Sequence, residues 1–375
     1  MSLQGSVAIV LDSGSLTTKA GFAGESFPRS IIPTTVGRFR QHGLNEGISD
    51  VYFGKEAKAK RGISKLTWPV KGGMIDDWED IEKLWHHIFY KELHVAPEES
   101  QVMIAVHPLT SRKDKERMAE ILFESFTIHD LYLAISTPLV LHASGRTSGV
   151  VWENGYSCSY ASPVFEGFPL KHATISCEIN GNILTERLQL LLSQIGFHFT
   201  TAIERDILET IKSELCYVSP DYNKELKTSK LTKESIPFKL PDGQDVLVGS
   251  ERFDVPELLF QPSLQGFDCP NILDVICSSI YKCDMEYKSL FFDNIVISGG
   301  TSMIKGLPER LNVELARRII DQTGIKVSVD AMPSRSIATW TGGSILASLK
   351  SVKGFWMTKE EYDDGGVDRV HYKFY

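Results

Sequence analysis

The chain has 375 residues, of which 42% are hydrophobic and 23% are charged, values typical of a globular protein with room for two domains. Its formal net charge of −8 argues against nucleic acid as a main partner, because phosphate binding favours a basic face. No apolar run is long enough to cross a membrane, and the opening MSLQGS lacks the pattern of a secretory signal. We therefore expect no membrane insertion and a cytoplasmic or nuclear location.

The first half of the chain alternates predicted strands and helices. Residues 7–11 form an apolar run that stops at the turn DSGS of residues 12–15, as a buried strand does when it enters a turn. Helices are predicted over residues 77–93 and 114–126, where apolar residues recur at helical spacing. The short apolar stretch 101–106 between them predicts a buried strand. This alternation indicates an α/β fold.

Two polar stretches are predicted to lie outside the core. Residues 37–50 contain glycines and show no periodicity, which predicts an exposed loop, and residues 222–237 predict a surface excursion. The sequence LPDGQ of residues 240–244 predicts a tight turn, because proline presets one dihedral angle and glycine accepts a positive φ.

The strand-and-turn pattern of the N-terminus returns in the middle of the chain. Residues 149–152 are apolar and lead into Glu153-Asn-Gly155, much as residues 7–11 lead into Asp12. An internal duplication would explain the second copy, but such a short pattern also arises by coincidence, so these two stretches alone leave both explanations open. A third strand leads into the glycines of residues 299–302, which form either a plain tight turn or a place where backbone N–H groups approach a ligand.

The cysteines give no sign of a zinc site. None forms a C-x-x-C pair, and no histidine spacing suggests a metal ligand. We expect small buried thiols in a reducing compartment. The six residues are Cys158, Cys177, Cys216, Cys269, Cys277 and Cys283.

Nine stretches occur in the order in which the actin family has them: DSGSLTTKAGFAG, HHIFYKELHVAPEES, FESF, HASGRTSG, PVFEGFPL, KSELCYV, KLPDGQ, VISGGTSM and TGGSILASL. The chain resembles that family over almost its whole length. The resemblance implies the two-lobed, ribonuclease H-like fold of actin-like ATPases and sugar kinases, with a nucleotide and a divalent cation in a central cleft. It implies an outer lobe of residues 1–144 plus 337–375 and an inner lobe of residues 145–336.

The resemblance also implies which residues bind the nucleotide. Asp12 and Glu153 would hold Mg²⁺ or Ca²⁺ through water, and Lys19 would reach the phosphates of ATP or ADP. Leu16 stands where the family has glycine, so a positive φ there would be strained and the loop shifted. The other residues implied to bind nucleotide are Ser13, Gly14, Ser15, Asn154, Gly155, Gly181, Lys212, Gly299, Gly300, Thr301 and Met303.

The second phosphate turn and the base pocket depart from the family pattern. Tyr156 replaces an acid and Ser157 replaces a glycine, which favours an altered grip on the γ-phosphate over neutral drift. Ser213, Ser336 and Asn182 replace a glutamate, a lysine and an arginine near the sugar and base. We expect nucleotide binding that is weaker than in actin or less selective for the base.

The residues that orient the attacking water are also replaced. The family uses a glutamine and a histidine, where this chain has Ser136 and Tyr160. Serine is too short to reproduce the glutamine contact, and tyrosine is a poor base near neutral pH. Because phosphoryl transfer depends on such positioning, we assign no catalytic residue and expect ATP hydrolysis to be slow or absent.

Surface residues imply protein partners. The loop Leu44–Gly47 is short and polar, whereas Pro262–Phe267 keeps the apolar residues of the family's plug. A partner groove is implied by a set of residues of which each, taken alone, could equally be core packing. They are Tyr132, His142, Leu346, Leu349 and Phe355. Actin or actin-binding proteins in a multiprotein complex are the expected partners, at a cytoskeletal location.

Two functions follow from these observations. The first is an actin-like structural protein that binds ATP with a divalent cation, hydrolyses it slowly or not at all, and acts in a protein assembly. The alternative is a conventional filament-forming actin ATPase. Ser136 and Tyr160 favour the first, and the length and retained helices support the second. A sugar kinase is disfavoured, because no candidate for its catalytic aspartate stands out.

Overall fold

The computed structural model describes residues 7–39 and 51–374, which fall into two compact units. Unit 1 comprises Met1–Thr147, Glu166–Lys171 and Ile337–Tyr375, and unit 2 comprises Ser148–Phe165 and His172–Ser336. The two lobes with boundaries after residues 144 and 336 stay a prediction. The loop predicted at Leu44–Gly47 lies outside the described residues.

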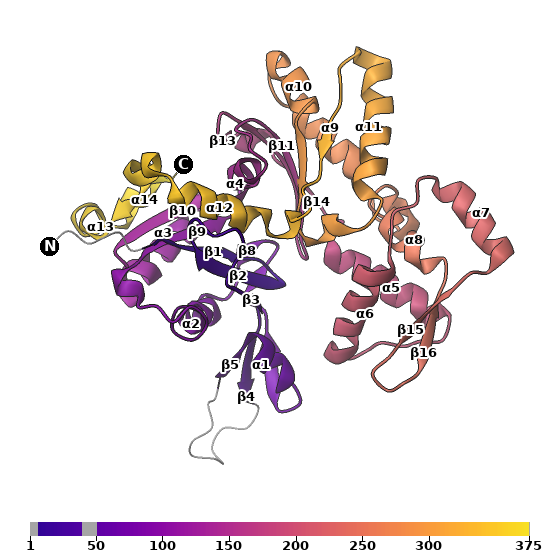
Figure 1. Ribbon diagram of the computed structural model, residues 1–375, viewed down its shortest axis with the longest axis horizontal. Coiled ribbons are helices and arrows are strands. Elements are labelled where there is room, and N and C mark those ends of the chain that lie inside the picture. The colour runs from indigo at the N-terminus through magenta and orange to yellow at the C-terminus, as the bar shows by residue number, and fades with distance from the viewer. Residues whose placement is uncertain (1–6, 40–50, 375) are drawn as a thin grey trace. The chain divides into compact units, whose positions relative to one another are not determined.

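A six-stranded sheet forms the centre of unit 1, in the order β19-β10-β9-β1-β2-β3 (Figure 1). β1 is parallel to β9 and β9 is parallel to β10, whereas the other neighbours are antiparallel. The strands are β1 (Ile9–Ser13), β2 (Thr17–Phe22), β3 (Ser30–Pro33), β9 (Gln101–Val106), β10 (Asp130–Ile135) and β19 (Met357–Thr358). The smaller strands are β4 (Val36–Phe39), β5 (Val51–Phe53), β6 (Ser64–Thr67), β7 (Val70–Lys71), β8 (Met74–Ile75) and β13 (Phe168–Pro169).

The two helices predicted in the first half of the chain are confirmed. The Asp77 carboxylate accepts the Asp80 N–H (3.0 Å) at the start of α2, and the Ser111 hydroxyl accepts the Asp114 N–H (3.1 Å) at the start of α3. Each helix runs on into a π-helical turn, Ile88–Glu92 and Ile121–Ser125. The helices of unit 1 are α1 (Gly54–Ala59), α2 (Trp78–His87), α3 (Arg112–Glu120), α4 (Ser136–Ala143), α12 (Ala338–Ser348), α13 (Lys359–Gly365) and α14 (Val370–Lys373).

Strand β1 is buried on both faces, as a central strand flanked by helices should be. Ile9 and Leu11 belong to one core cluster, together with Trp85 of α2. Val10 points to the other face, where it packs in a second cluster with Leu139 of α4 and Trp340 of α12. The apolar run at residues 7–11 is thus explained by a strand with no solvent-facing side.

Helix α12 lies close to its neighbours because its middle carries two glycines. A Cβ atom added to Gly342 would lie 1.7 Å from the carbonyl oxygen of Leu139 in α4. A Cβ atom on Gly343 would lie 2.8 Å from Cγ1 of Val10 in β1. The glycine pair in TGGSILASL therefore serves close packing of backbones.

Unit 2 is built on a sheet in the order β12-β11-β17-β18, with β14 pairing β12. The strands are β11 (Gly149–Asn154), β12 (Ser159–Phe165), β14 (Ile175–Cys177), β17 (Ile295–Ser298) and β18 (Val329–Asp330). The helices are α5 (Gly181–Gln194), α6 (Ala202–Leu215), α7 (Tyr222–Thr232), α8 (Glu251–Glu257), α9 (Ile272–Tyr281), α10 (Met285–Phe292) and α11 (Leu307–Thr323).

The two sheets share one construction, which supports internal duplication over coincidence. In each, a hairpin (β1–β2 or β11–β12) has an antiparallel strand on one side and two parallel strands on the other. Asp12 pairs with Lys19 across the first hairpin, and Glu153 pairs with Tyr160 across the second. Both turns close with the same bond, since the amides of Gly14 and Gly155 donate to the carbonyl three residues later (3.1 and 2.8 Å).

One predicted surface excursion is more ordered than expected. Within residues 222–237, Tyr222–Thr232 forms helix α7, because the Asp221 side chain caps its first turn. The predicted turn at 240–244 is confirmed, since it joins β15 (Ile236–Lys239) to β16 (Asp245–Val248) and Gly243 has a φ of +89°. Of the predicted loop at 37–50, residues up to Phe39 belong to β4.

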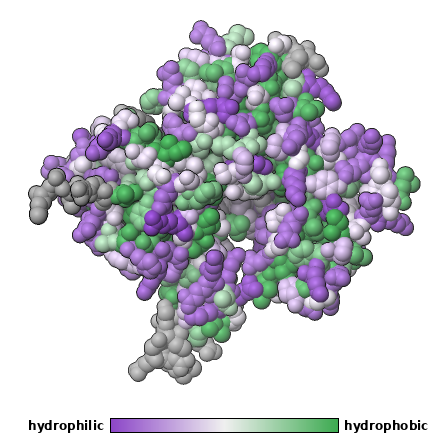
Figure 2. All heavy atoms as spheres, in the orientation of Figure 1, coloured by the Kyte–Doolittle hydropathy of each residue, from purple (hydrophilic) through white to green (hydrophobic). Residues whose placement is uncertain are grey.

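The visible face of the molecule carries many polar residues, with hydrophobic residues scattered between them (Figure 2). Among the described residues, no helix combines the length and apolar character needed to span a bilayer.

Candidate functional site

The first hairpin turn brings Asp12 and Lys19 together. The Lys19 ammonium lies 3.0 Å from the Asp12 carboxylate, and both side chains are largely buried. The Trp85 indole donates to the Ser13 hydroxyl (3.2 Å), and the Thr34 hydroxyl donates to the Gly14 carbonyl (2.6 Å). These bonds fix the turn from two further segments of unit 1, so its acid and its lysine are held in place before any ligand arrives.

The strain predicted at Leu16 is absent. The described non-glycine residues with positive φ are His94, Thr127, Glu166 and Lys233, and Leu16 is not among them. Its carbonyl accepts the Thr34 N–H (3.0 Å), as an ordinary hairpin turn allows. The prediction failed because the turn between β1 and β2 closes without a left-handed residue at this position.

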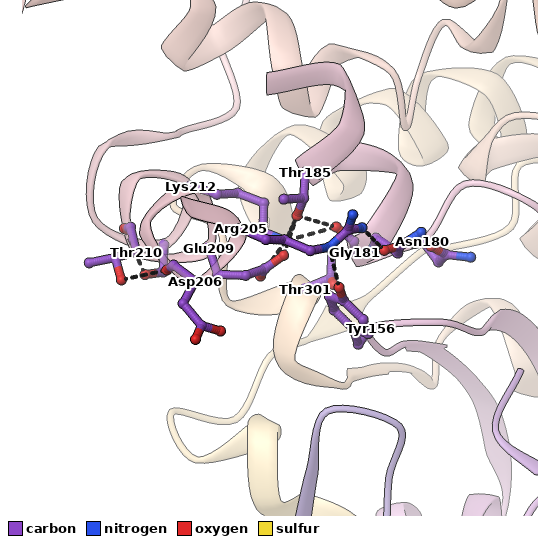
Figure 3. Close-up of polar contacts among 12 residues, drawn as sticks. Tyr156, Asn180, Gly181, Thr185, Arg205, Asp206, Glu209, Thr210, Lys212 and Thr301 are labelled. Carbon is purple, nitrogen blue, oxygen red and sulfur yellow. Dashed lines mark hydrogen bonds and ion pairs between the residues drawn. The ribbon is translucent and has the colours of Figure 1, made fainter. Parts of the chain in front are cut away.

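Three glycine-bearing segments of unit 2 meet at the second hairpin turn (Figure 3). The Gly155 carbonyl accepts both the Gly181 N–H (3.0 Å) and the Thr301 hydroxyl (2.9 Å). A Cβ atom on Gly181 would lie 2.4 Å from the Thr301 hydroxyl oxygen, so only glycine fits there. Gly181 is also the first residue of α5, and a helix N-terminus favours an anion.

The turn after β17 is equally close to the hairpin. Gly299 has a φ of +93°, and a Cβ atom on it would lie 2.3 Å from the Asn154 carbonyl oxygen. The Arg335 guanidinium donates to the Ser302 carbonyl (2.9 Å), and this bond helps to fix the turn. By contrast, a Cβ atom on Gly300 would meet nothing within 4 Å. Gly300 therefore faces open space beside three tightly packed backbones.

Lys212 is buried next to these segments (Figure 3). Its ammonium donates to the Gly181 carbonyl (2.7 Å) and the Thr185 hydroxyl (2.6 Å), and it lies 2.8 Å from the Glu209 carboxylate. Burial lowers the pKa of the Lys212 ammonium, against the opposing effect of Glu209. Thr185 and Glu209 were not predicted, although Glu209 lies three residues before Lys212 on one helix, where side chains meet.

Tyr156 takes part in a polar cluster that the sequence did not suggest. Arg205 of α6 donates through Nε to the Tyr156 hydroxyl (3.0 Å) and also hydrogen-bonds the Asn182 side chain (Figure 3). Asn182 in turn donates to Glu186 (2.8 Å), and Arg205 lies 3.6 Å from Glu186. Two of the departures from the family pattern, Tyr156 and Asn182, thus share one arginine.

The two replaced hydrolysis positions lie in different units. Ser136 is buried at the start of α4 in unit 1. Tyr160 is buried in unit 2, and its hydroxyl donates to the Glu153 carboxylate (2.7 Å). The Tyr160 hydroxyl therefore bonds the acid implied to hold the cation, which leaves it poorly suited to activate a water.

The residues of the implied partner groove all lie in unit 1. The Tyr132 ring stacks on Phe355 at a centroid distance of 6.5 Å, and Leu346 packs against the adjoining core cluster. Leu349 and Phe355 are 47% and 55% exposed. Burial lowers the pKa of His142. Exposed apolar side chains beside a half-buried ring are compatible with a docking surface.

The residues that the resemblance implies to bind nucleotide divide between the two units. Unit 1 holds Asp12, Ser13, Gly14, Ser15 and Lys19 in one turn. Unit 2 holds the rest: Gly155, Gly181, Lys212 and Thr301 are joined by hydrogen bonds, Gly299 packs on Asn154, and Glu153, Gly300 and Met303 lie in the same chain segments. Asn154 is fully buried and its side-chain oxygen accepts no hydrogen bond from the described residues. Met303 is 40% exposed.

The class of protein is thus defined by two α/β sheets of like construction, each with a hairpin that has an acid before a glycine-containing turn. A family model described as Actin matches residues 4–375, and the chain belongs to the actin family. Proteins of this family are cytoskeletal and generally bind a nucleotide with a divalent cation. Membership also suggests, in general terms, actin-related interactions with other proteins.

Proposed function

We propose that the protein binds ATP or ADP with Mg²⁺, hydrolyses ATP slowly or not at all, and acts as a structural component of a protein assembly. The observation that carries the proposal is the cluster in unit 2, where Gly155, Gly181 and Thr301 are bonded to one another beside the open face of Gly300. Backbones that approach this closely suit a ligand recognised through its phosphates and sugar.

The residues present fit a magnesium nucleotide. Asp12 and Glu153 supply a carboxylate in each hairpin, and Mg²⁺ needs only one or two when it keeps several waters. The cation would supply charge neutralisation for the phosphates. Lys19 would bind phosphate oxygens, and Lys212 would act indirectly by holding the Gly181 carbonyl and the start of α5.

Gly300→Ala tests the nucleotide site without disturbing the fold. The added methyl group meets no protein atom within 4 Å, so thermal unfolding should match the wild type. If the nucleotide lies against this glycine, the methyl group blocks it, and the affinity for ATP with Mg²⁺ should fall at least about tenfold, roughly 1.4 kcal/mol. Isothermal titration calorimetry measures the change.

Gly62→Ala is the matched control, because its Cβ atom also meets nothing within 4 Å and Gly62 is not a predicted nucleotide residue. It should leave both unfolding and ATP affinity unchanged. Wild-type protein that binds neither ATP nor ADP would refute the nucleotide proposal, and equal affinity in the wild type and Gly300→Ala would remove Gly300 from the site.

Slow hydrolysis is supported by Tyr160, whose hydroxyl is bonded to Glu153. Changing Ser136→Gln together with Tyr160→His should raise the rate of phosphate release from ATP at least about tenfold, because a positioned base typically contributes 10²–10⁴-fold. Tyr160→Phe is the control, since it breaks the bond to Glu153 without adding a base, and it should give no gain.

Phosphate release measured alongside pelleting separates the proposal from the conventional filament-forming ATPase. The proposed function predicts little phosphate release and little sedimentable polymer from the protein alone. Fast release together with sedimentable polymer would favour the alternative.

Binding of actin or an actin-binding protein through Tyr132, Leu349 and Phe355 is part of the proposal. A Phe355→Ala variant should weaken the binding of that partner.

A further inference from the structure

Two thiols of unit 2 that are far apart in the sequence lie side by side. Cys177 ends β14, and Cys269 lies in the loop between the short helix Pro262–Gln265 and α9. The Cys177 thiol donates to the carbonyl of Pro270 (3.5 Å), the residue that directly follows Cys269 in the chain. Both are partly accessible, whereas Cys216, Cys277 and Cys283 are buried.

We propose that Cys177 and Cys269 form a reversible redox pair, in which a two-electron oxidant such as hydrogen peroxide closes a disulfide and a thiol reductant opens it. The inference is independent of the nucleotide proposal, because neither cysteine belongs to the nucleotide cluster. It corrects the expectation of small buried thiols for these two residues, since the structure makes them partly accessible and places Cys177 against the residue that follows Cys269.

The reaction balances with one molecule of peroxide. The Cys269 thiol loses its proton and its sulfur attacks one peroxide oxygen, so that the O–O bond breaks, a sulfenic acid forms, and hydroxide leaves and takes up the proton as water. The Cys177 sulfur then attacks the sulfenic sulfur, the S–O bond breaks, and the second water leaves with the Cys177 proton. Two thiols are oxidised to one disulfide while one peroxide is reduced to two waters.

The contact gives this pair an advantage over the other thiols. Burial raises the pKa of Cys177 to about 11 and also raises that of Cys269, so the thiolate fractions at neutral pH are small and the first step is slow. Once the sulfenic acid has formed at Cys269, the Cys177 thiol is already held beside the next residue, Pro270, so disulfide formation competes well with further oxidation.

The disulfide would restrain a segment of functional interest. Residues 262–267 form the predicted apolar plug, and Cys269 follows two residues after it. A bond from Cys269 to β14 would anchor the end of this segment to a sheet strand, since β14 pairs with β12. Oxidation is therefore expected to slow amide hydrogen exchange over residues 262–271 and to leave exchange in unit 1 unchanged.

Peptide mapping of the full chain tests the pair. The reduced protein is treated with graded hydrogen peroxide, alkylated and digested without reductant, and a peptide linking Cys177 to Cys269 is expected by mass spectrometry. It should appear before Cys216, Cys277 or Cys283 is modified and should vanish after dithiothreitol. Cys177→Ser and Cys269→Ser should each abolish it, whereas Cys158→Ser, which removes the other partly accessible thiol, should not.

Three outcomes would overturn the proposal: no linked peptide while the two thiols are oxidised separately to sulfinic acids, linkage of either cysteine to another cysteine, or linkage only between chains. Because the mapping uses wild-type protein, it stays decisive even if a serine variant folds poorly. Either result leaves ATP affinity as a separate question, which the Gly300→Ala experiment answers.

Discussion

Gly342→Ala is expected to destabilise the protein by about 3 kcal/mol or more, the upper end of the usual cost of overpacking. The added methyl carbon would lie 1.7 Å from the Leu139 carbonyl oxygen, a backbone atom that cannot yield without moving helix α4. The loss should appear as a lower urea midpoint and a lower thermal midpoint for unfolding.

The same change at an uncrowded glycine provides the comparison. Gly354→Ala places its methyl group where no atom lies within 4 Å, so it should change the free energy of unfolding by no more than about 0.5 kcal/mol. A Gly342→Ala protein that unfolds at the wild-type midpoint would show that α4 and α12 are farther apart than described here.

The second large effect is expected at a buried ion pair in unit 2. Arg310 of α11 and Glu257 of α8 are bonded to each other, with side chains 8% and 0% exposed, and Arg310 also donates to the Ser219 carbonyl (3.0 Å). Arg310→Met leaves the Glu257 carboxylate buried without its cation, which typically costs about 3–5 kcal/mol. Chemical denaturation measures the loss.

A double change distinguishes the uncompensated charge from lost packing. Arg310→Met with Glu257→Leu removes both charges and keeps apolar volume, so it should be more stable than Arg310→Met alone, because a buried pair replaced by apolar residues is often neutral. If the double variant is less stable than the single one, the charge explanation is wrong. The stability would then come from the packing of Arg310 on the Phe260 ring, whose centroid lies 4.0 Å from the guanidinium carbon.

The sequence predicted those parts of the fold that repeat a local pattern. Asp77 and the apolar spacing after it located helix α2, and the run at 7–11 located a strand that is buried on both faces. Helix α7 was missed because residues 222–232 bury little apolar surface, so their periodicity is weak, and only the capping Asp221 indicated a helix. The duplication became clear only from strand order and register, which short sequence patterns do not specify.

The glycines of the candidate site were predicted from the resemblance to the actin family, and the structure gives two of them a local reason. Gly299 needs a positive φ, and Gly181 has no room for a side chain. Arg205 and Thr185 were missed because their partners come from other segments, and such pairs depend on how helices α5 and α6 pack. Glu209 could have been found, because it lies three residues before Lys212 on one helix. The bond from Tyr160 to Glu153 follows from hairpin register, which the sequence left open.

The arginine shared by Tyr156 and Asn182 has an evolutionary consequence. The resemblance to the actin family implies that the chain lost an acid at 156 and an arginine at 182, two opposite charges beside Arg205. Restoring the arginine alone would set two guanidinium groups beside the single carboxylate of Glu186, whereas restoring the acid would give Arg205 a second anion to bind. The two positions should therefore show epistasis: a double-mutant cycle on unfolding should deviate from additivity by about 0.5–3 kcal/mol, so the effect of either ancestral step depends on whether the other has occurred.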